Sequence, residues 1–223
     1  MSEEIIMDWT GKKINFLGDS ITEGCGVDPR EECRFTTLLK PMLGLAESRN
    51  YGIGGTRIAP QSKENFGPSF VDRAPDMDPD ADLIVVFGGT NDFGHGDAPF
   101  GNVDEIWDRD KSTFCGAMRA LLTELAEKFP KTRVVVLTPL HRCSEMVTTN
   151  EIGLPCHILH DYVEAERRIC EYYSVPVLDL WSVSGIQPCI PASKKQYTAD
   201  GLHPNDCGME RVADLLIGFL RTL

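Results

Sequence analysis

Short apolar stretches alternate with longer amphipathic ones along most of the chain. Residues 83–87 (LIVVF) and 133–138 (RVVVLT) are nearly continuous apolar runs, which are typical of strands buried between two layers of helices. Similar but shorter runs predict three further strands, at 13–17, 48–51 and 175–180. The pattern therefore predicts five short strands distributed over the length of the chain.

Apolar residues between and after these strands recur with the three- and four-residue spacing of a helix that buries one face. The clearest stripe runs over 114–129 and stops at Pro130, and similar stripes cover 158–172 and 212–220. Strands that alternate with helices predict an α/β fold, with a parallel sheet and helices on both of its sides. We see no repeat and no linker-like composition, so we expect one domain over residues 1–223.

Composition and charge narrow the choice of partners. The 223 residues are 42% apolar and 25% charged, as in ordinary globular proteins. Thirty-four acidic against 22 basic side chains give a net charge of −12, which argues against nucleic acid or an anionic membrane as the main partner. The longest apolar runs are far shorter than the roughly 20 residues that span a bilayer, so no membrane span is expected.

The amino terminus and the cysteines carry weaker signals. The first eight residues include Glu3, Glu4 and Asp8 and lack the basic and apolar regions of a signal peptide, so we expect a cytoplasmic protein. The eight cysteines are scattered and form no C-x-x-C pair. This spacing favours reduced thiols over a disulfide framework, and it does not suggest a metal site.

Two segments that follow predicted strands could form part of a ligand site, because ligands of such sheets bind beyond the carboxyl ends of the strands. In 18–22 (GDSIT), Ser20 could present its hydroxyl at the positive end of a helix, or Asp19 or Ser20 could simply be an N-cap. In 50–56 (NYGIGGT), the glycines could bring backbone N–H groups close to an oxyanion, or could only form a tight turn.

Two further segments can reach the same edge. In 88–92 (GGTND), Asn91 offers a neutral amide donor, although Asn91 or Asp92 could merely cap the local backbone in an Asx-turn. In 200–204 (DGLHP), Asp200 could orient His203 as a base, although an exposed turn with an incidental histidine has the same pattern.

The four segments together supply what nucleophilic acyl transfer needs: a hydroxyl, a base, a group that orients the base, and donors for the oxyanion. In their order along the chain they resemble the motif blocks of the SGNH (GDSL) hydrolase family. The first block is here Gly-Asp-Ser-Ile-Thr, with Ile21 where the family name has Leu, and we expect its side chain simply to pack. The other blocks are the glycine segment 50–56, 89–92 (GTND) and Asp200-x-x-His203.

The resemblance implies a fold and a set of roles. The fold is a three-layer α/β/α sandwich around a flavodoxin-like, five-stranded parallel sheet. Ser20 would be the nucleophile, His203 the base and then the acid, and Asp200 the group that orients His203. The oxyanion hole would comprise the Ser20 N–H, the Asn91 amide and one glycine N–H. Gly55 fits the family's G-x-S-G pattern best, with Gly54 in the place of its Ser; Gly54 is the alternative donor. No metal or organic cofactor is required.

The substrate is indicated only in outline. The family acts on esters of sugars, lipids and lysophospholipids and on small thioesters. The motif blocks adjoin no long apolar stripe, which favours a short acyl group, such as acetyl on a carbohydrate or another small molecule. A lysophospholipase or lipase, an acyltransferase and a catalytically silent binding module stay open as alternatives, as does a homo-oligomer. Residues 141–157 are predicted to form a binding loop or lid. His95 is predicted to be a surface loop residue, with contact to the substrate as the alternative.

Overall fold

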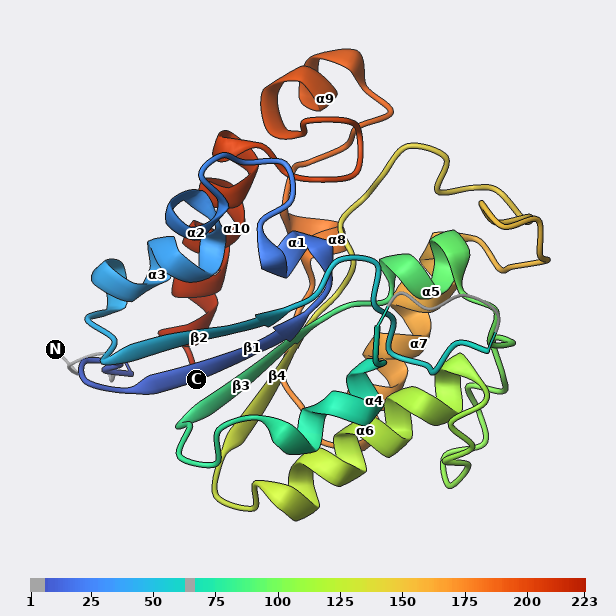
Figure 1. Ribbon diagram of the computed structural model, residues 1–223, viewed down its shortest axis with the longest axis horizontal. Helices are drawn as coiled ribbons and strands as arrows, with labels where there is room; N and C mark the ends of the chain where they lie inside the picture. The colour runs from blue at the N-terminus through green and yellow to red at the C-terminus, as the bar shows by residue number, and fades with distance from the viewer. Residues whose placement is uncertain (1–6, 63–66) are drawn as a thin grey trace, which may run out of the picture.

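The computed structural model describes residues 7–62 and 67–223, and Glu3 and Glu4 lie outside that range. Its centre is a parallel sheet in the order β2-β1-β3-β4-β5 (Figure 1). In the described residues the strands are β1 (Lys13–Gly18), β2 (Glu47–Gly52), β3 (Leu83–Phe87), β4 (Arg133–Leu137) and β5 (Val177–Leu178). The predicted α/β class and five-stranded parallel sheet are thus confirmed.

Helices cover both faces of this sheet. The described helices are α1 (Ser20–Glu23), α2 (Arg30–Cys33), α3 (Phe35–Leu43), α4 (Phe70–Arg73), the 3₁₀ turn η1 (Ala74–Asp76), α5 (Thr90–His95), α6 (Phe114–Lys128), α7 (Leu159–Tyr172), α8 (Leu180–Val183), α9 (Pro191–Tyr197) and α10 (Asp206–Leu220). Figure 1 shows α2, α3 and α10 on one side of the sheet and α4, α6 and α7 on the other.

Two buried clusters hold these layers together, and β3 shows how the sheet divides them. Ile84 and Val86 belong to the cluster under α6 and α7, whereas Leu83, Val85 and Phe87 belong to the cluster under α3 and α10. All five side chains are at least 98% buried. Because successive strand residues point to opposite faces, a strand between two helical layers must be apolar throughout, which is why 83–87 could be identified as a strand.

The fifth strand is shorter than the sequence predicts. The expected strand covered 175–180, but only Val177–Leu178 pairs with β4. Asp179 caps α8, because its side chain accepts a hydrogen bond from the Ser182 N–H, and the chain turns into a helix at Leu180. The prediction of one strand over 175–180 is therefore wrong at its ends, because the apolar run includes an N-cap residue.

Two of the three predicted helices are confirmed, the third begins earlier than predicted, and a further helix was not predicted. The stripes at 114–129 and 158–172 correspond to α6 and α7, which confirms both. The third helix begins before 212, at Asp206, where Asn205 accepts a hydrogen bond from the Gly208 N–H as N-cap. α3 was not predicted: its start has no side-chain cap, and Pro41 lies inside its last turn, where the sequence suggests a break.

The sheet aligns the strand ends on which the site depends. Gly18 of β1 is paired in register with Gly52 of β2 and with Phe87 of β3, and Phe87 is paired with Leu137 of β4. The loops that follow these four strands therefore emerge together at the carboxyl edge.

Among the residues that the structure describes, the helices are all too short or too polar to cross a bilayer.

Candidate active site

Three side chains from the two ends of the chain meet at the carboxyl edge. The Ser20 hydroxyl lies 3.0 Å from His203 Nε2, and His203 Nδ1 lies 2.7 Å from Asp200 Oδ2. With the ring proton on Nδ1, donated to Asp200, Nε2 is free to accept the hydroxyl proton of Ser20. The structure thus brings together the three residues that the sequence proposed as a triad, in the geometry that proton transfer requires.

The strand-to-helix turn after β1 places Ser20. Asp19 is the N-cap of α1, and its carboxyl group accepts a hydrogen bond from the Ile21 N–H at 2.9 Å. Ser20 is therefore the first residue of the helix, and its side chain is buried to 93%. The N-cap alternative and the nucleophile interpretation are compatible here, because Asp19 caps the helix while Ser20 points to His203. Ile21 packs in the core, as expected.

A short bridged turn places His203. Thr198 and Pro204 form an antiparallel bridge, and the Ala199 N–H donates to the His203 carbonyl at 2.8 Å. Asp200 Oδ1 closes the turn by accepting from the backbone N–H groups of Leu202 and His203 at 2.9 and 2.8 Å. Burial alone would raise the pKa of Asp200, but the hydrogen bonds from the ring and backbone of His203 and from Leu202 together hold it below its ordinary value. Asp200 therefore stays ionised beside the imidazole.

Asn91 and the glycine loop face each other across the same edge. Asn91 Nδ2 donates to the Thr56 carbonyl at 3.0 Å, which uses one of its two amide hydrogens. Gly55 has a φ of 74°, in the left-handed region that glycine adopts without strain. A Cβ added to Gly54 would lie 3.9 Å from Ser20 Cβ, so this loop runs directly beside the serine. Among the described residues, the second Asn91 amide hydrogen and the N–H groups of Gly54 and Gly55 have no acceptor, so they can serve as donors.

Asp92 has a different role from the local cap considered for it. Its two carboxyl oxygens accept hydrogen bonds from the N–H groups of Ile58 and Ala59, both at 3.0 Å. Asp92 therefore joins the loop after β2 to the helix that carries Asn91, and the Asx-turn interpretation is wrong for this residue. Burial raises the pKa of Asp92 to about 6 and that of Asp19 to about 7.

A half-buried arginine joins the ends of the first two strands. The Arg73 guanidinium donates to the carbonyls of Gly18 and Tyr51 and to the Thr56 hydroxyl. Burial lowers its pKa to about 10, so it stays charged at neutral pH. Sequence reasoning missed this residue, because its partners lie up to 55 positions away and no local pattern indicates them.

Glu166 of α7 is a second buried group that the sequence did not indicate. Its side chain is 99% buried, and neither carboxyl oxygen has a hydrogen-bond partner among the described residues. A Cβ on Gly89 would lie 2.2 Å from Glu166 Oε1, so the carboxyl group packs against the loop that leads to Asn91. Burial, reinforced by the nearby Asp92 and Asp19, holds the pKa of Glu166 well above its ordinary value.

The raised pKa of Glu166 predicts how the stability of the fold changes with pH. A carboxyl group whose pKa is higher in the folded state stabilises the fold fully below its unfolded pKa of 4.5, and that contribution is lost as the pH rises towards the folded value. Glu166→Gln removes the titration. We therefore expect the Tm of this variant, relative to wild type, to increase steadily between pH 5 and pH 8 in thermal unfolding. The exposed α6 variant Glu127→Gln should show no such trend. A Tm difference that is constant with pH would contradict the assignment.

The surrounding loops differ in part from expectation. Residues 138–158 connect β4 to α7, and they pack on α5 through the Asn150 amide, which donates to the Gly96 carbonyl, and the Glu151 N–H, which donates to the Gly94 carbonyl. His95 ends α5 and is half-buried, with Nδ1 3.4 Å from Arg57 Nη1, so its prediction as a surface loop residue is wrong.

In the described part of the chain, no group of three or more His, Cys, Asp or Glu side chains could hold a metal ion.

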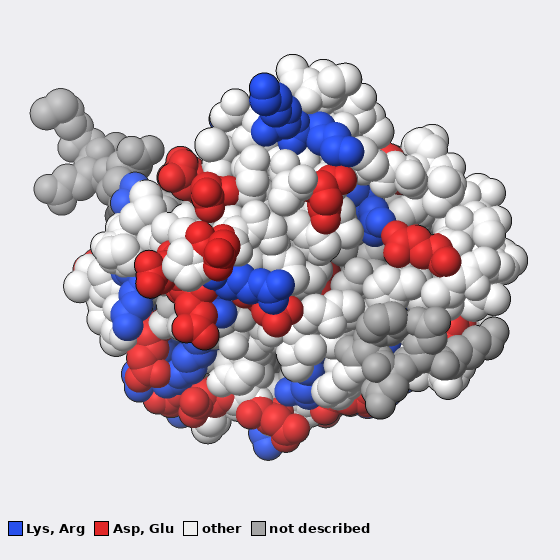
Figure 2. Space-filling model, turned by 45° about the horizontal axis from the view of Figure 1, so that its top comes forward, with Lys and Arg blue, Asp and Glu red and all other residues white. Residues whose placement is uncertain are grey.

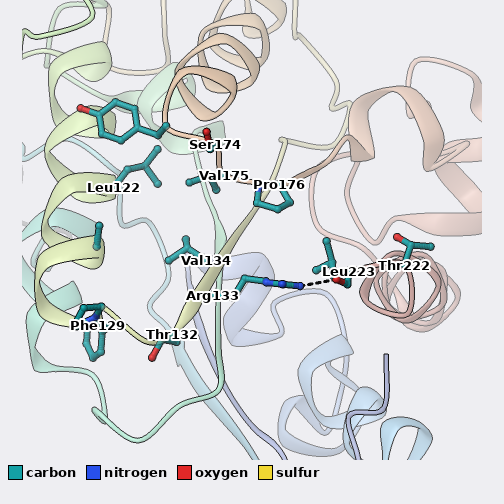
Figure 3. A pocket seen from close by; sticks show the side chains of 13 residues that line it. Leu122, Phe129, Thr132, Arg133, Val134, Ser174, Val175, Pro176, Thr222 and Leu223 are labelled. Carbon is teal, nitrogen blue, oxygen red and sulfur yellow. Dashed lines mark hydrogen bonds between the residues drawn. The ribbon is translucent and has the colours of Figure 1, made fainter. Parts of the chain in front are cut away.

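A cavity of about 550 Å³ lies at the opposite edge of the sheet (Figure 3). Arg133, at the start of β4, lines it, and its guanidinium donates to the carbonyl of the terminal Leu223. Since Ser20 follows the end of a strand and this cavity adjoins the beginning of one, the two lie at different ends of the fold. This cavity therefore plays no part in the candidate site.

Comparison with known proteins agrees with this geometry. Residues 16–211 match the model of the GDSL-like Lipase/Acylhydrolase family. A crystal structure of a protein from Lactobacillus plantarum superposes with a TM-score of 0.80 at 32% identity, over 95% of this chain and 97% of that one. No match is found among curated proteins.

Two more distant structures share the fold. A possible lipase from Chitinophaga pinensis has a TM-score of 0.68 at 21% identity, with 94% of this chain and 97% of that one covered. The M. smegmatis aryl esterase has a TM-score of 0.68 at 18% identity, with 95% and 99% covered. The match to the family model covers most of the chain and includes Ser20, Asn91, Asp200 and His203. This chain therefore belongs to the GDSL-like lipase/acylhydrolase family.

Proposed function

We propose that the protein is a serine esterase that hydrolyses carboxylic esters through an acyl-enzyme on Ser20. The observation that carries this proposal is the continuous hydrogen-bonded chain from the Ser20 hydroxyl through His203 to Asp200, with distances of 3.0 and 2.7 Å. A hydroxyl that donates to a neutral, oriented imidazole can lose its proton as it attacks a carbonyl.

The reaction runs in two halves. Ser20 Oγ forms a bond to the ester carbonyl carbon while its proton passes to His203 Nε2. The tetrahedral intermediate then collapses, the bond to the alcohol oxygen breaks, and His203 gives its proton to the departing alcohol. In the second half, water attacks the acyl carbonyl carbon while His203 Nε2 takes one of its protons. The bond to Ser20 Oγ then breaks, the carboxylic acid leaves, and His203 returns the proton to Ser20 Oγ. Asp200, which stays ionised, stabilises the imidazolium in both halves.

The oxyanion of each tetrahedral intermediate requires donors that do not titrate. We assign this role to the Ser20 N–H, the second hydrogen of the Asn91 amide and the Gly55 N–H, with Gly54 as the alternative glycine. The Asn91 bond to Thr56 fixes the amide plane, and the Asp92 bonds to Ile58 and Ala59 hold the two donor segments at a constant spacing. Donors fixed before the reaction begins stabilise the developing charge without reorganising.

We further propose a short acyl group, such as acetyl, carried by a carbohydrate or another small alcohol. The motif blocks, which adjoin no long apolar stripe, support this choice, and the cavity between α5 and the loop after β4 is small, with a volume of about 150 Å³. A long alkyl chain would require a larger enclosure.

Labelling with a fluorophosphonate tests the nucleophile directly. Ser20 should displace fluoride and form a stable phosphonyl ester, which mass spectrometry of a digest should locate on the peptide that contains residue 20. His203→Ala should slow labelling strongly, because the base that activates the hydroxyl is gone. An adduct on another serine, or no adduct on the folded protein, would exclude this proposal; the second result is also the one expected of a catalytically silent binding module.

A further inference from the structure

Glu23 brings a carboxylate to the edge of the catalytic serine. It is the last residue of α1, one helical turn after Ser20, and its side chain is 36% exposed. A Cβ added to Gly54 would lie 2.8 Å from Glu23 Oε2 and 3.9 Å from Ser20 Cβ. The carboxylate and the nucleophile therefore flank the same point on the glycine loop.

The backbone around Glu23 is closely fixed. A Cβ on Gly52 would lie only 2.2 Å from the Glu23 nitrogen, so the end of β2 packs directly on this turn. The Asn50 side chain adds a hydrogen bond from Nδ2 to the Thr22 carbonyl at 2.5 Å. Because α1 packs closely against the end of β2, the backbone of Glu23 is fixed beside Ser20, and its side chain extends from a well-packed helix and not from a flexible loop.

The carboxylate is only loosely engaged within the protein. Arg30 Nη1 lies 3.5 Å from Glu23 Oε1, and the Arg30 side chain is 52% exposed. Oε2 is approached by the Cys25 thiol, a weak donor, at 3.9 Å. An exposed ion pair at this distance contributes little to stability. Figure 2, in which the upper part of Figure 1 is turned towards the viewer, shows acidic and basic side chains mixed over that side of the molecule.

Gly54 explains why the carboxylate can occupy this place. A Cβ at position 54 would lie 2.8 Å from Glu23 Oε2, so any other residue there would meet the carboxylate in its present position. The absence of a Cβ at position 54 thus leaves room for the Glu23 carboxylate beside the nucleophile. Gly54 leaves the space, and the carboxylate of Glu23, a hydrogen-bond acceptor, occupies it.

We propose that the Glu23 carboxylate binds a hydroxyl group of the substrate next to the scissile ester, and so selects esters of polyols and sugars over esters of simple alcohols. This proposal rests on the proposed function and specifies its substrate class. A carboxylate beside the reacting centre accepts a charge-assisted hydrogen bond from a hydroxyl group, and an analogue without that hydroxyl leaves the charge without its partner. The negative charge of the Glu23 carboxylate also repels anionic substrates.

A pair of substrates that differ only in hydroxyl groups tests the proposal: 2,3-dihydroxypropyl acetate and propyl acetate. The quantity to compare is the ratio of their kcat/KM values. We expect Glu23→Ala to lower this ratio by about tenfold to a hundredfold, mainly through a higher KM for the dihydroxy ester. Glu23→Gln, which keeps an acceptor oxygen without the charge, should lower it less. The distant Glu127→Ala should leave the ratio unchanged.

Two further variants separate substrate binding from a merely structural role. Gly54→Ala adds a Cβ that displaces the carboxylate, and it should lower the ratio as Glu23→Ala does. Arg30→Met removes the ion pair but keeps the carboxylate, and it should leave the ratio at or above the wild-type value. A ratio unchanged in both Glu23→Ala and Gly54→Ala, or lowered equally by Arg30→Met, would overturn the proposal.

The outcome also distinguishes this proposal from the proposed function. If wild type cleaves both acetates and Ser20 takes the fluorophosphonate label, but the ratio does not respond to Glu23, only the role of Glu23 fails. If neither acetate nor any activated ester is cleaved and Ser20 takes no label, the esterase proposal fails and this one fails with it.

Discussion

Ser20→Ala is expected to lower kcat for p-nitrophenyl acetate by roughly 10⁴- to 10⁶-fold, close to the rate of spontaneous hydrolysis. Without the hydroxyl no acyl-enzyme can form, and the oxyanion donors alone can only assist the direct attack of water. The Ser20 hydroxyl bonds to His203, and the side chain fits within the strand-to-helix turn, so alanine should be accommodated without loss of the fold. Steady-state kinetics with the activated ester measures the effect.

Ser48→Ala is a matched control for this experiment. Ser48 lies near the beginning of β2, at the far end from the site, and its hydroxyl donates to the Thr36 carbonyl. Its loss should cost about 1 kcal/mol of unfolding free energy and leave kcat unchanged. If Ser20→Ala kept most of the wild-type activity while remaining folded, the nucleophile would have to be another residue.

The strands and main helices were predictable where one interaction dominates. Residues 83–87 are apolar on both faces because helices cover both, and the predicted bounds are those of β3. α6 has a regular apolar stripe and a proline just beyond its end. Errors arose where a single polar residue redirects the chain, as Asp179 does when it ends β5 and caps α8. A hydrophobic pattern records which face is buried, but it does not show where a side-chain cap ends an element.

The residues of the candidate site also fall into those that the sequence predicts and those that it does not. Ser20, Asn91, Asp200 and His203 lie in motifs whose spacing is visible in the sequence, and the parallel sheet necessarily brings the segments that follow its strands to one edge. Arg73, Glu166 and Glu23 carry no such signal. Each acts through contacts with residues far along the chain, such as the carbonyl of Gly18 for Arg73 and the loop at Gly89 for Glu166.

One domain over 1–223 and a cytoplasmic location stay predictions.

Asn91→Ala has the second largest expected effect, a fall in kcat of about 10²- to 10³-fold with little change in KM. The Asn91 amide should donate to the oxyanion more strongly in the transition state than to the ester carbonyl in the ground state, so its loss acts on the chemical step. The variant also loses the 3.0 Å bond to the Thr56 carbonyl, which should cost about 1 kcal/mol of unfolding free energy.

Asn15→Ala separates these two effects. Asn15 is fully buried in β1, and its Nδ2 donates to the Asp78 carbonyl at 2.9 Å, so this variant loses the same type of hydrogen bond away from the carboxyl edge. Both variants should show similar losses in urea unfolding, whereas only Asn91→Ala should lose kcat. Equal kcat values for Asn91→Ala and wild type would remove Asn91 from the oxyanion hole. A loss of kcat shared by Asn15→Ala would show instead that catalysis responds to the stability of the sheet.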